Sequence, residues 1–198
     1  MMKSFMIDED FPVVIDCIQS FELKTPIDDE SNAAEIIVYP QRENSEIKPE
    51  FIVNPSTPIR LALEALNCFE VVENQFQHWG ITFENAIALQ PSNPAFVLKP
   101  ATTVIMAAPK GGVLEINFKY PVQKVFGLIT SSRATVLSAY NGEGQKVAET
   151  RMNVSPHLNS DSLNFPNAQL KLSGLNLQKI IFETFDGQLI LHHLQVEF

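Results

Sequence analysis

Several residues of this sequence carry side chains that suit the binding of a polyhydroxylated ligand. Aromatic rings stack against the apolar face of a sugar, and amide or guanidinium groups hydrogen-bond its hydroxyls. In segments predicted to be loops, such groups belong to Arg133, Tyr140, Asn141, Arg151, His157 and Asn164. Together these side chains make a saccharide, or a similar polyhydroxylated molecule, a candidate ligand.

Trp79 is the only tryptophan, and it lies just before a segment predicted to be a strand at 81–89. If exposed, its ring would offer a platform for a sugar. If buried, it would close one end of a β-barrel or sandwich. We expect the buried arrangement, and the sugar platform is the alternative.

Catalytic patterns are absent from the sequence. We find no nucleophile elbow, phosphate-binding loop, dinucleotide-binding fingerprint, zinc pattern or kinase signature. His192 and His193 are adjacent, and consecutive residues of a regular strand point to opposite faces, so we expect that they cannot chelate one metal together. The sequence therefore favours a protein that is not an enzyme, and an uncharacterised hydrolase is a minor alternative.

Short apolar segments separated by turn residues fill the last two thirds of the chain. Leu114, Ile116 and Phe118 alternate with polar residues, which is the period of a half-buried strand. Asn141 and Gly142 suit a hairpin turn. Strands are predicted at 81–89, 102–107, 113–118, 123–130, 134–140, 145–152, 168–172, 177–185 and 189–198. This pattern predicts an all-β sandwich or jelly roll.

The first third of the chain differs in charge. The 198 residues carry a net charge of −9, of which residues 1–66 contribute −8 and residues 67–198 contribute −1. We therefore divide the chain into an acidic N-terminal extension, 1–66, with short strands near 13–18, 35–39 and 51–53, and a sandwich domain, 67–198. Residues 60–66 could form a helical turn or continue a strand. We expect the extension to pack on the main domain. It could be merely solvated, or it could dock a basic protein partner.

Composition and sequence ends limit the partners and the compartment. A pI of about 4.9 disfavours nucleic acid and anionic membrane surfaces as partners. No apolar segment has the length of a signal peptide or a membrane span, so we expect a cytoplasmic protein, secreted only if a leader has been removed.

Cys17 and Cys68 are expected to be free thiols, with one disulfide as the alternative, and Cys68 is expected to be buried. The oligomeric state is left open.

From residue 67 onward the chain resembles the galactose-binding-domain-like jelly-roll modules common in cyanobacterial and other bacterial proteins. The opening match is Cys68-Phe69-Glu70 followed by Gly80-Ile81-Thr82-Phe83. Further matches are Leu114-Glu115-Ile116-Asn117-Phe118, Leu137-Ser138-Ala139-Tyr140-Asn141 and Ile180-Ile181-Phe182 with Asp186-Gly187. The resemblance covers about two thirds of the chain and rests mainly on core and turn residues.

The resemblance implies a galactose-binding-like β-sandwich that binds its ligand in loops at one end. There the ligand-binding residues would be Trp79, Arg133, Tyr140, Asn141, Arg151 and His157. It also implies a structural calcium held by Glu70 and Glu197. Three functions stay open: a carbohydrate- or protein-binding module, a scaffold protein that uses the acidic extension, and a hydrolase.

Overall fold

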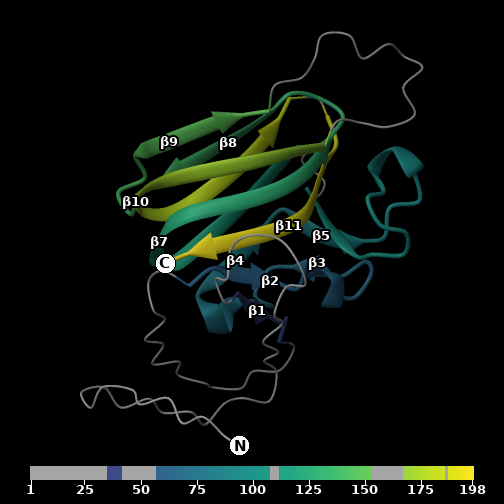
Figure 1. The fold of residues 1–198 in the computed structure, drawn as a ribbon, viewed down its shortest axis with the longest axis horizontal. Coiled ribbons are helices and arrows are strands. Elements are labelled where there is room, and N and C mark those ends of the chain that lie inside the picture. Colours follow the sequence, from purple (N-terminus) through teal and green to yellow (C-terminus); the bar gives the residue numbers. More distant parts are fainter. Residues whose placement is uncertain (1–34, 42–56, 108–111, 153–166, 186) are drawn as a thin grey trace, which may run out of the picture.

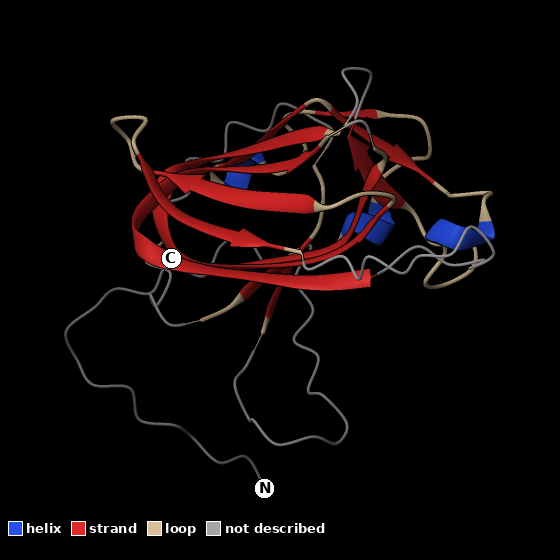
Figure 2. Cartoon of the chain, turned by 90° about the horizontal axis from the view of Figure 1, so that it is seen from above, coloured by secondary structure: helices blue, strands red, loops and turns tan. Residues whose placement is uncertain are grey.

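Strands make up most of the chain that the computed structural model describes, which is residues 35–41, 57–107, 112–152, 167–185 and 187–198. Three short 3-10 helices, η1 (Leu63–Ala65), η2 (Gln77–Trp79) and η3 (Pro94–Phe96), interrupt the strands of the described part. Figure 2 draws the helices in blue among the red strands. The strands are β1 (Ile36–Val38), β2 (Ile59–Leu61), β3 (Val71–Val72), β4 (Ile81–Glu84), β5 (Ala86–Leu89), β6 (Val104–Ala107), β7 (Val113–Ser131), β8 (Thr135–Tyr140), β9 (Lys146–Arg151), β10 (Asn167–Thr184) and β11 (Leu189–Glu197).

Two long strands, β7 and β10, run through both layers of a sandwich, and Figure 1 shows them side by side. The N-terminal part of β7 and the C-terminal part of β10 belong to one layer, in the order β4-β7-β10-β8-β9. Their other halves belong to the second layer, in the order β3-β5-β6-β11-β7-β10. All these pairings are antiparallel. β2 pairs with the end of β11 and in parallel with β1.

The bend that carries β10 from one layer to the other lies near its middle. The pairing register with β7 shifts between Ser173 and Leu177, where Leu175 projects with 82% of its surface exposed. Asn176 has a φ of +57°, in the left-handed region that asparagine tolerates better than most residues. The predicted breaks at 119–122 and 173–176 are therefore wrong as strand ends, because the chain bends there without leaving the sheet.

A second difference from prediction occurs at Asn85. The segment predicted as one strand, 81–89, forms two strands that belong to different layers: β4 pairs with β7, whereas β5 pairs with β3 and β6. Asn85 has a φ of +57°, and this left-handed residue redirects the chain between the layers.

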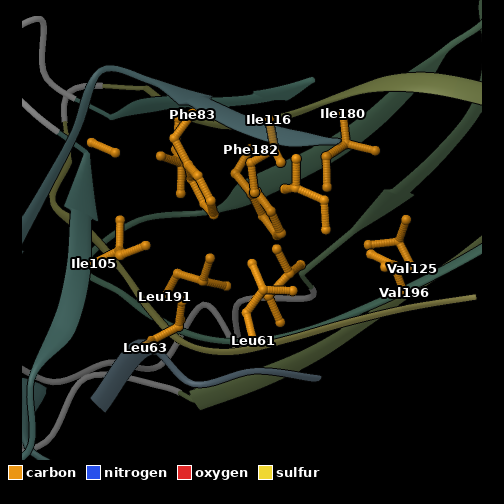
Figure 3. Packing of buried hydrophobic residues seen from close by; sticks show 14 of the residues in the cluster. Leu61, Leu63, Phe83, Ile105, Ile116, Val125, Ile180, Phe182, Leu191 and Val196 are labelled. Carbon is orange, nitrogen blue, oxygen red and sulfur yellow. The ribbon is translucent and has the colours of Figure 1, made fainter. Parts of the chain in front are cut away.

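The core lies between the two layers. Figure 3 shows Phe83, Ile116 and Phe182 on one side, facing Leu61, Leu63 and Leu191 on the other. In the first part of β7, Leu114, Ile116 and Phe118 alternate inward, as the sequence pattern predicted. The all-β, jelly-roll type of sandwich expected from the sequence is confirmed.

The described part of residues 1–66 is built into this core. Ile59 and Leu61 of β2, and Leu63 of η1, are fully buried. Residues 60–66 thus contain both alternatives proposed for them, the end of a strand and one helical turn. The strands expected near 13–18 and 51–53, and Cys17, lie outside the described residues.

Cys68 is exposed rather than buried, which corrects the sequence prediction. It precedes Phe69, whose φ of +69° turns the chain outward so that 76% of the Phe69 surface is exposed. Among the described residues, no helix has the length and apolar character needed to cross a membrane.

Candidate functional site

The outer face of the layer that contains β10, β7 and β11 carries a groove. On β7, Val125 and Ile129 point into the core, so Phe126 and Leu128 point outward. The register pairs Phe126 with Lys171 on one side and with Gln195 on the other. A half-buried aromatic ring is thereby placed in the middle of this face, flanked by polar side chains.

The first hollow of the groove has a volume of about 390 Å³, and Phe126 is the aromatic residue among those that line it. Lys171 Nζ lies 5.5 Å from the centroid of the Phe126 ring, and the ring of His193 meets it edge-on at 5.4 Å. Lys124 Nζ donates a hydrogen bond to Glu197 Oε2 at 2.7 Å. This hollow therefore combines one apolar ring with several groups able to donate or accept hydrogen bonds.

A second hollow, of about 330 Å³, continues along the same face beyond His193. The segment 91–102 with η3 forms one wall, and it packs Phe96 against Val104 and Ile190. Asn93 begins η3 by accepting a hydrogen bond from the backbone N–H of Ala95 at 3.0 Å. The opposite wall is polar, because Arg60 and Glu64 form an ion pair of 3.0 Å there.

His192 and His193 both line this second hollow, which corrects the expectation that they face opposite sides. The pairing register of β11 with β7 shifts between Leu191 and His193, which is a β-bulge. A bulge adds one residue to a strand and re-aims the side chains around it. The strict alternation used in the prediction therefore fails at this position.

The imidazole of His192 is held in one tautomer by a buried hydroxyl. Thr130, which is fully buried, donates its hydroxyl hydrogen to Asn167 Oδ1 and so accepts from His192 Nε2–H at 2.7 Å. Burial lowers the pKa of His192 to about 4, so the ring is neutral at pH 7. A neutral ring that donates through Nε2 has an unprotonated Nδ1, which is a hydrogen-bond acceptor.

Lowering the pH from 7 to 4 is expected to destabilise the protein partly through His192. Its pKa is about 4 in the folded state and 6.5 by reference, so in this window the unfolded chain binds more protons. Stability is therefore lost as the pH falls below about 6.5. Urea unfolding at pH 7, 6 and 5 measures this, and the His192→Gln variant should show a shallower dependence. Parallel profiles of wild type and variant would contradict the assignment.

Of the site residues predicted from the sequence that the structure describes, only Glu197 lines this groove. Tyr140 and Asn141 lie where β8 turns toward β9. Asn141 Oδ1 accepts from the backbone N–H groups of Glu143 and Gln145, at 3.1 and 2.9 Å, so it organises the predicted hairpin turn. Lys179 Nζ lies 5.5 Å from the centroid of the Tyr140 ring and pairs with Glu115 at 3.5 Å. Tyr140 and Asn141 line neither of the two hollows.

Arg133 and Arg151 lie at the other end of the same hairpin, since Arg151 pairs with Val136 near the start of β8. Arg151 is held by Glu149 at 2.7 Å, and the hydrogen bonds from Lys146 and Arg151 lower the pKa of Glu149. The residues predicted for one site are thus split between two ends of the strand pair.

Three further predicted residues have separate outcomes. Trp79 is half-buried on η2 and packs against the main core, and its role as a plug stays a prediction. His157 and Asn164 lie outside the described residues.

Glu70 and Glu197, the carboxylates of the implied calcium site, are on different strands. Glu70 precedes β3, and its carbonyl accepts from Ala88 of β5, whereas Glu197 ends β11 and pairs with Lys124. Figure 1 places β3 and the end of β11 on opposite sides of the molecule. Within the described residues, no three His, Cys, Asp or Glu side chains are grouped as metal ligands. These two carboxylates do not fit one shared calcium site, and a structural calcium stays a prediction.

Phe126 and Lys171 escaped the sequence analysis, although one signal pointed to Phe126, and Glu197 was considered only as a metal ligand. In the predicted strand 123–130, the residues between the inward-pointing ones should be polar, and Phe126 and Leu128 are not. An apolar residue on an outward position marks a covered or binding surface. The partners of Phe126 come from β10 and β11, and their register is not readable from the sequence.

Comparison with known proteins gives similarity in structure only, since the chain matches no family model and no curated protein. A family 29 carbohydrate-binding module in complex with cellulohexaose has a TM-score of 0.38 and 10% identity, and the match covers 59% of this chain and 80% of that one. TmCBM61 in complex with β-1,4-galactotriose has a TM-score of 0.27 and 6% identity, with 61% and 88% covered. The enzymatically active domain of bacteriophage CBA120 tailspike protein 4 has a TM-score of 0.24 and 9% identity, with 69% and 21% covered.

Similarity at this level carries neither a ligand nor a residue role to this chain. The description of the protein therefore rests on its own strand pairing and side chains: a two-layer antiparallel β-sandwich with a groove on one outer face.

Proposed function

We propose that this chain is a non-catalytic binding module that holds a saccharide in the groove on the outer face of β10, β7 and β11. The observation that carries the proposal is the Phe126 ring, which lies in a hollow of about 390 Å³ between Lys171 and Gln195. A sugar presents an apolar ring face and a border of hydroxyls, and this hollow offers partners for both. Ser173 adds a hydroxyl at the same border.

The carboxylates of the groove favour binding over hydrolysis. A glycosidase of the common type needs two carboxyl groups that face each other across the substrate. The residues that line the two hollows include one glutamate each, Glu197 and Glu64. Both are held in ion pairs, with Lys124 at 2.7 Å and with Arg60 at 3.0 Å.

Replacing Phe126 with alanine is expected to weaken saccharide binding at least tenfold, because the stacking surface is removed while the strand pairing is kept. Affinity electrophoresis against a panel of neutral and acidic polysaccharides identifies a ligand, and calorimetry then gives its Kd. Phe185→Ala is the matched control, since Phe185 is 90% exposed and lies outside the groove.

The Tyr140→Ala variant separates this groove from the loop site that the sequence suggested. It should bind as the wild type does. Loss of binding in Tyr140→Ala, with Phe126→Ala unaffected, would refute the groove and restore the loop site.

One observation favours the protein-binding alternative. Phe69 and Val71 are 76% and 60% exposed beside the short edge strand β3. Exposed apolar side chains at a sheet edge are suited to contact another protein. The acidic extension, for which a docking arm was one alternative, lies mostly outside the described residues, so that interaction stays a prediction.

A further inference from the structure

The first hollow contains more positive than negative charge. Its lining includes two ammonium groups, of Lys124 and Lys171, and one carboxylate, of Glu197. Lys124 donates one of its three ammonium hydrogens to Glu197 at 2.7 Å, which leaves two for another acceptor. In the part of the chain that the structure describes, Lys171 has no ion-pair partner, and its ammonium lies over the Phe126 ring.

Strand register places the two lysines so that both can reach one group. Phe126 pairs with Lys171, and Lys124 pairs with Ser173, so Lys124 and Lys171 are diagonal neighbours on adjacent strands. Diagonal neighbours of an antiparallel pair have Cα atoms about 7–8 Å apart, which long side chains span easily. An anionic group at the border of the Phe126 ring would therefore lie within reach of two ammonium groups.

The second hollow is close to neutral. Its lining includes Arg60 and Lys99. Arg60 pairs with two carboxylates, those of Glu64 at 3.0 Å and Glu35 at 3.8 Å. The two histidines there contribute no charge at pH 7, because burial lowers the pKa of both. Residues 67–198 carry a net charge of only −1, and the positive excess of the groove lies in its first hollow.

We propose that the ligand of this groove is an acidic saccharide whose sugar ring stacks on Phe126 and whose carboxylate is bound by Lys171 and Lys124. The inference deepens the proposed function and rests on it. A uronic acid carries its carboxylate at the edge of the sugar ring, so a ring stacked on Phe126 directs that group toward the surrounding side chains. Charge-assisted hydrogen bonds from ammonium to carboxylate are about twice as strong as neutral ones. Ser173 supplies a further donor for the same group.

The experiment uses the full chain and three probes: oligogalacturonate, its methyl ester, and dextran sulfate. Calorimetry should give a Kd for oligogalacturonate at least tenfold lower than for the methyl ester, which keeps the ring and loses the charge. The affinity should fall when NaCl is raised from 50 to 200 mM, because salt screens the contact. Lys171→Gln should weaken oligogalacturonate binding about tenfold, and Lys171→Arg should restore it to within about threefold.

Lys119→Gln is the matched control. Lys119 Nζ lies 5.4 Å from the centroid of the Tyr120 ring, an arrangement like that of Lys171 over Phe126 but outside both hollows. This variant should bind oligogalacturonate as the wild type does. Circular dichroism and the melting temperature show whether each variant is folded. If Lys171→Gln does not fold, the comparison of oligogalacturonate with its methyl ester, made on the wild type and on Lys171→Arg, still tests the role of charge.

The outcomes separate this inference from the proposed function. Equal binding of oligogalacturonate and its methyl ester, both abolished by Phe126→Ala, would overturn the acidic ligand and leave the saccharide groove standing. Tighter binding of dextran sulfate than of oligogalacturonate would overturn the assignment of a carboxylate. Failure of the folded protein to bind any saccharide of the panel would overturn the proposed function together with this inference.

Discussion

Replacing Phe182 with alanine is expected to lower the free energy of unfolding by about 3–5 kcal/mol. Phe182 is fully buried, and its strand is paired on both sides, with Leu114 of β7 and Leu137 of β8. Its ring also fills the space beside Gly127, where an added Cβ would lie 2.9 Å from Phe182 Cζ. Because the backbone is held on both sides, the cavity left by the ring cannot collapse, and the loss should lie in the upper part of that range.

Urea unfolding followed by circular dichroism measures this change. Phe185→Ala offers a control only three residues away, since Phe185 is 90% exposed. Its free energy of unfolding should stay within about 0.5 kcal/mol of the wild-type value, as for most surface substitutions. A loss below about 2 kcal/mol for Phe182→Ala would contradict the central place of this ring in the core.

Gly112→Ala is expected to be the second large loss, of about 2–5 kcal/mol, from two separate causes. Gly112 has a φ of +86°, a conformation that costs a residue with a Cβ about 1–2 kcal/mol. The added Cβ would also lie 2.1 Å from the carbonyl oxygen of Thr184. Thr184 cannot simply move away, because its N–H donates to the Gly112 carbonyl at 2.7 Å. Overpacking of this kind costs about 1–3 kcal/mol more.

Gly144→Ala separates the two causes. Gly144 has a φ of +76°, but no atom lies within 4 Å of the position that its Cβ would take. This variant should therefore lose only the conformational cost of about 1–2 kcal/mol. If the two alanine variants have equal stability, the contact with Thr184 does not constrain the turn.

The sequence was sufficient to predict the all-β fold class, because the alternation of apolar and polar residues along a strand is visible within a short segment. The inward positions Leu114, Ile116 and Phe118 could be read directly and are buried. What could not be read is where a strand bends or changes layer. Asn85 and Asn176 both adopt a φ of +57°, yet the first separates two strands and the second lies within one. Only the partners that surround each residue decide between these outcomes.

The candidate site was missed for a related reason. The sequence analysis looked for ligand-binding groups in loops, whereas the groove is assembled on a sheet face from strands far apart in the chain. Lys171, Phe126 and Gln195 become neighbours only through the register of β10, β7 and β11. The β-bulge that turns His192 and His193 to one side also cannot be predicted from the alternation of residues along the strand.

The position of β11 has a consequence for how the protein is made. This strand is the last of the fold in chain order, yet it lies between β6 and β7 and also closes the sheet against β2. A ribosome that has synthesised β1 to β10 has therefore produced a sheet with its middle strand missing. Because synthesis proceeds at about 5–20 residues per second, the inner faces of β2, β6 and β7 lack that strand for several seconds. Until β11 leaves the exit tunnel, those apolar faces are open to chaperones and to neighbouring nascent chains.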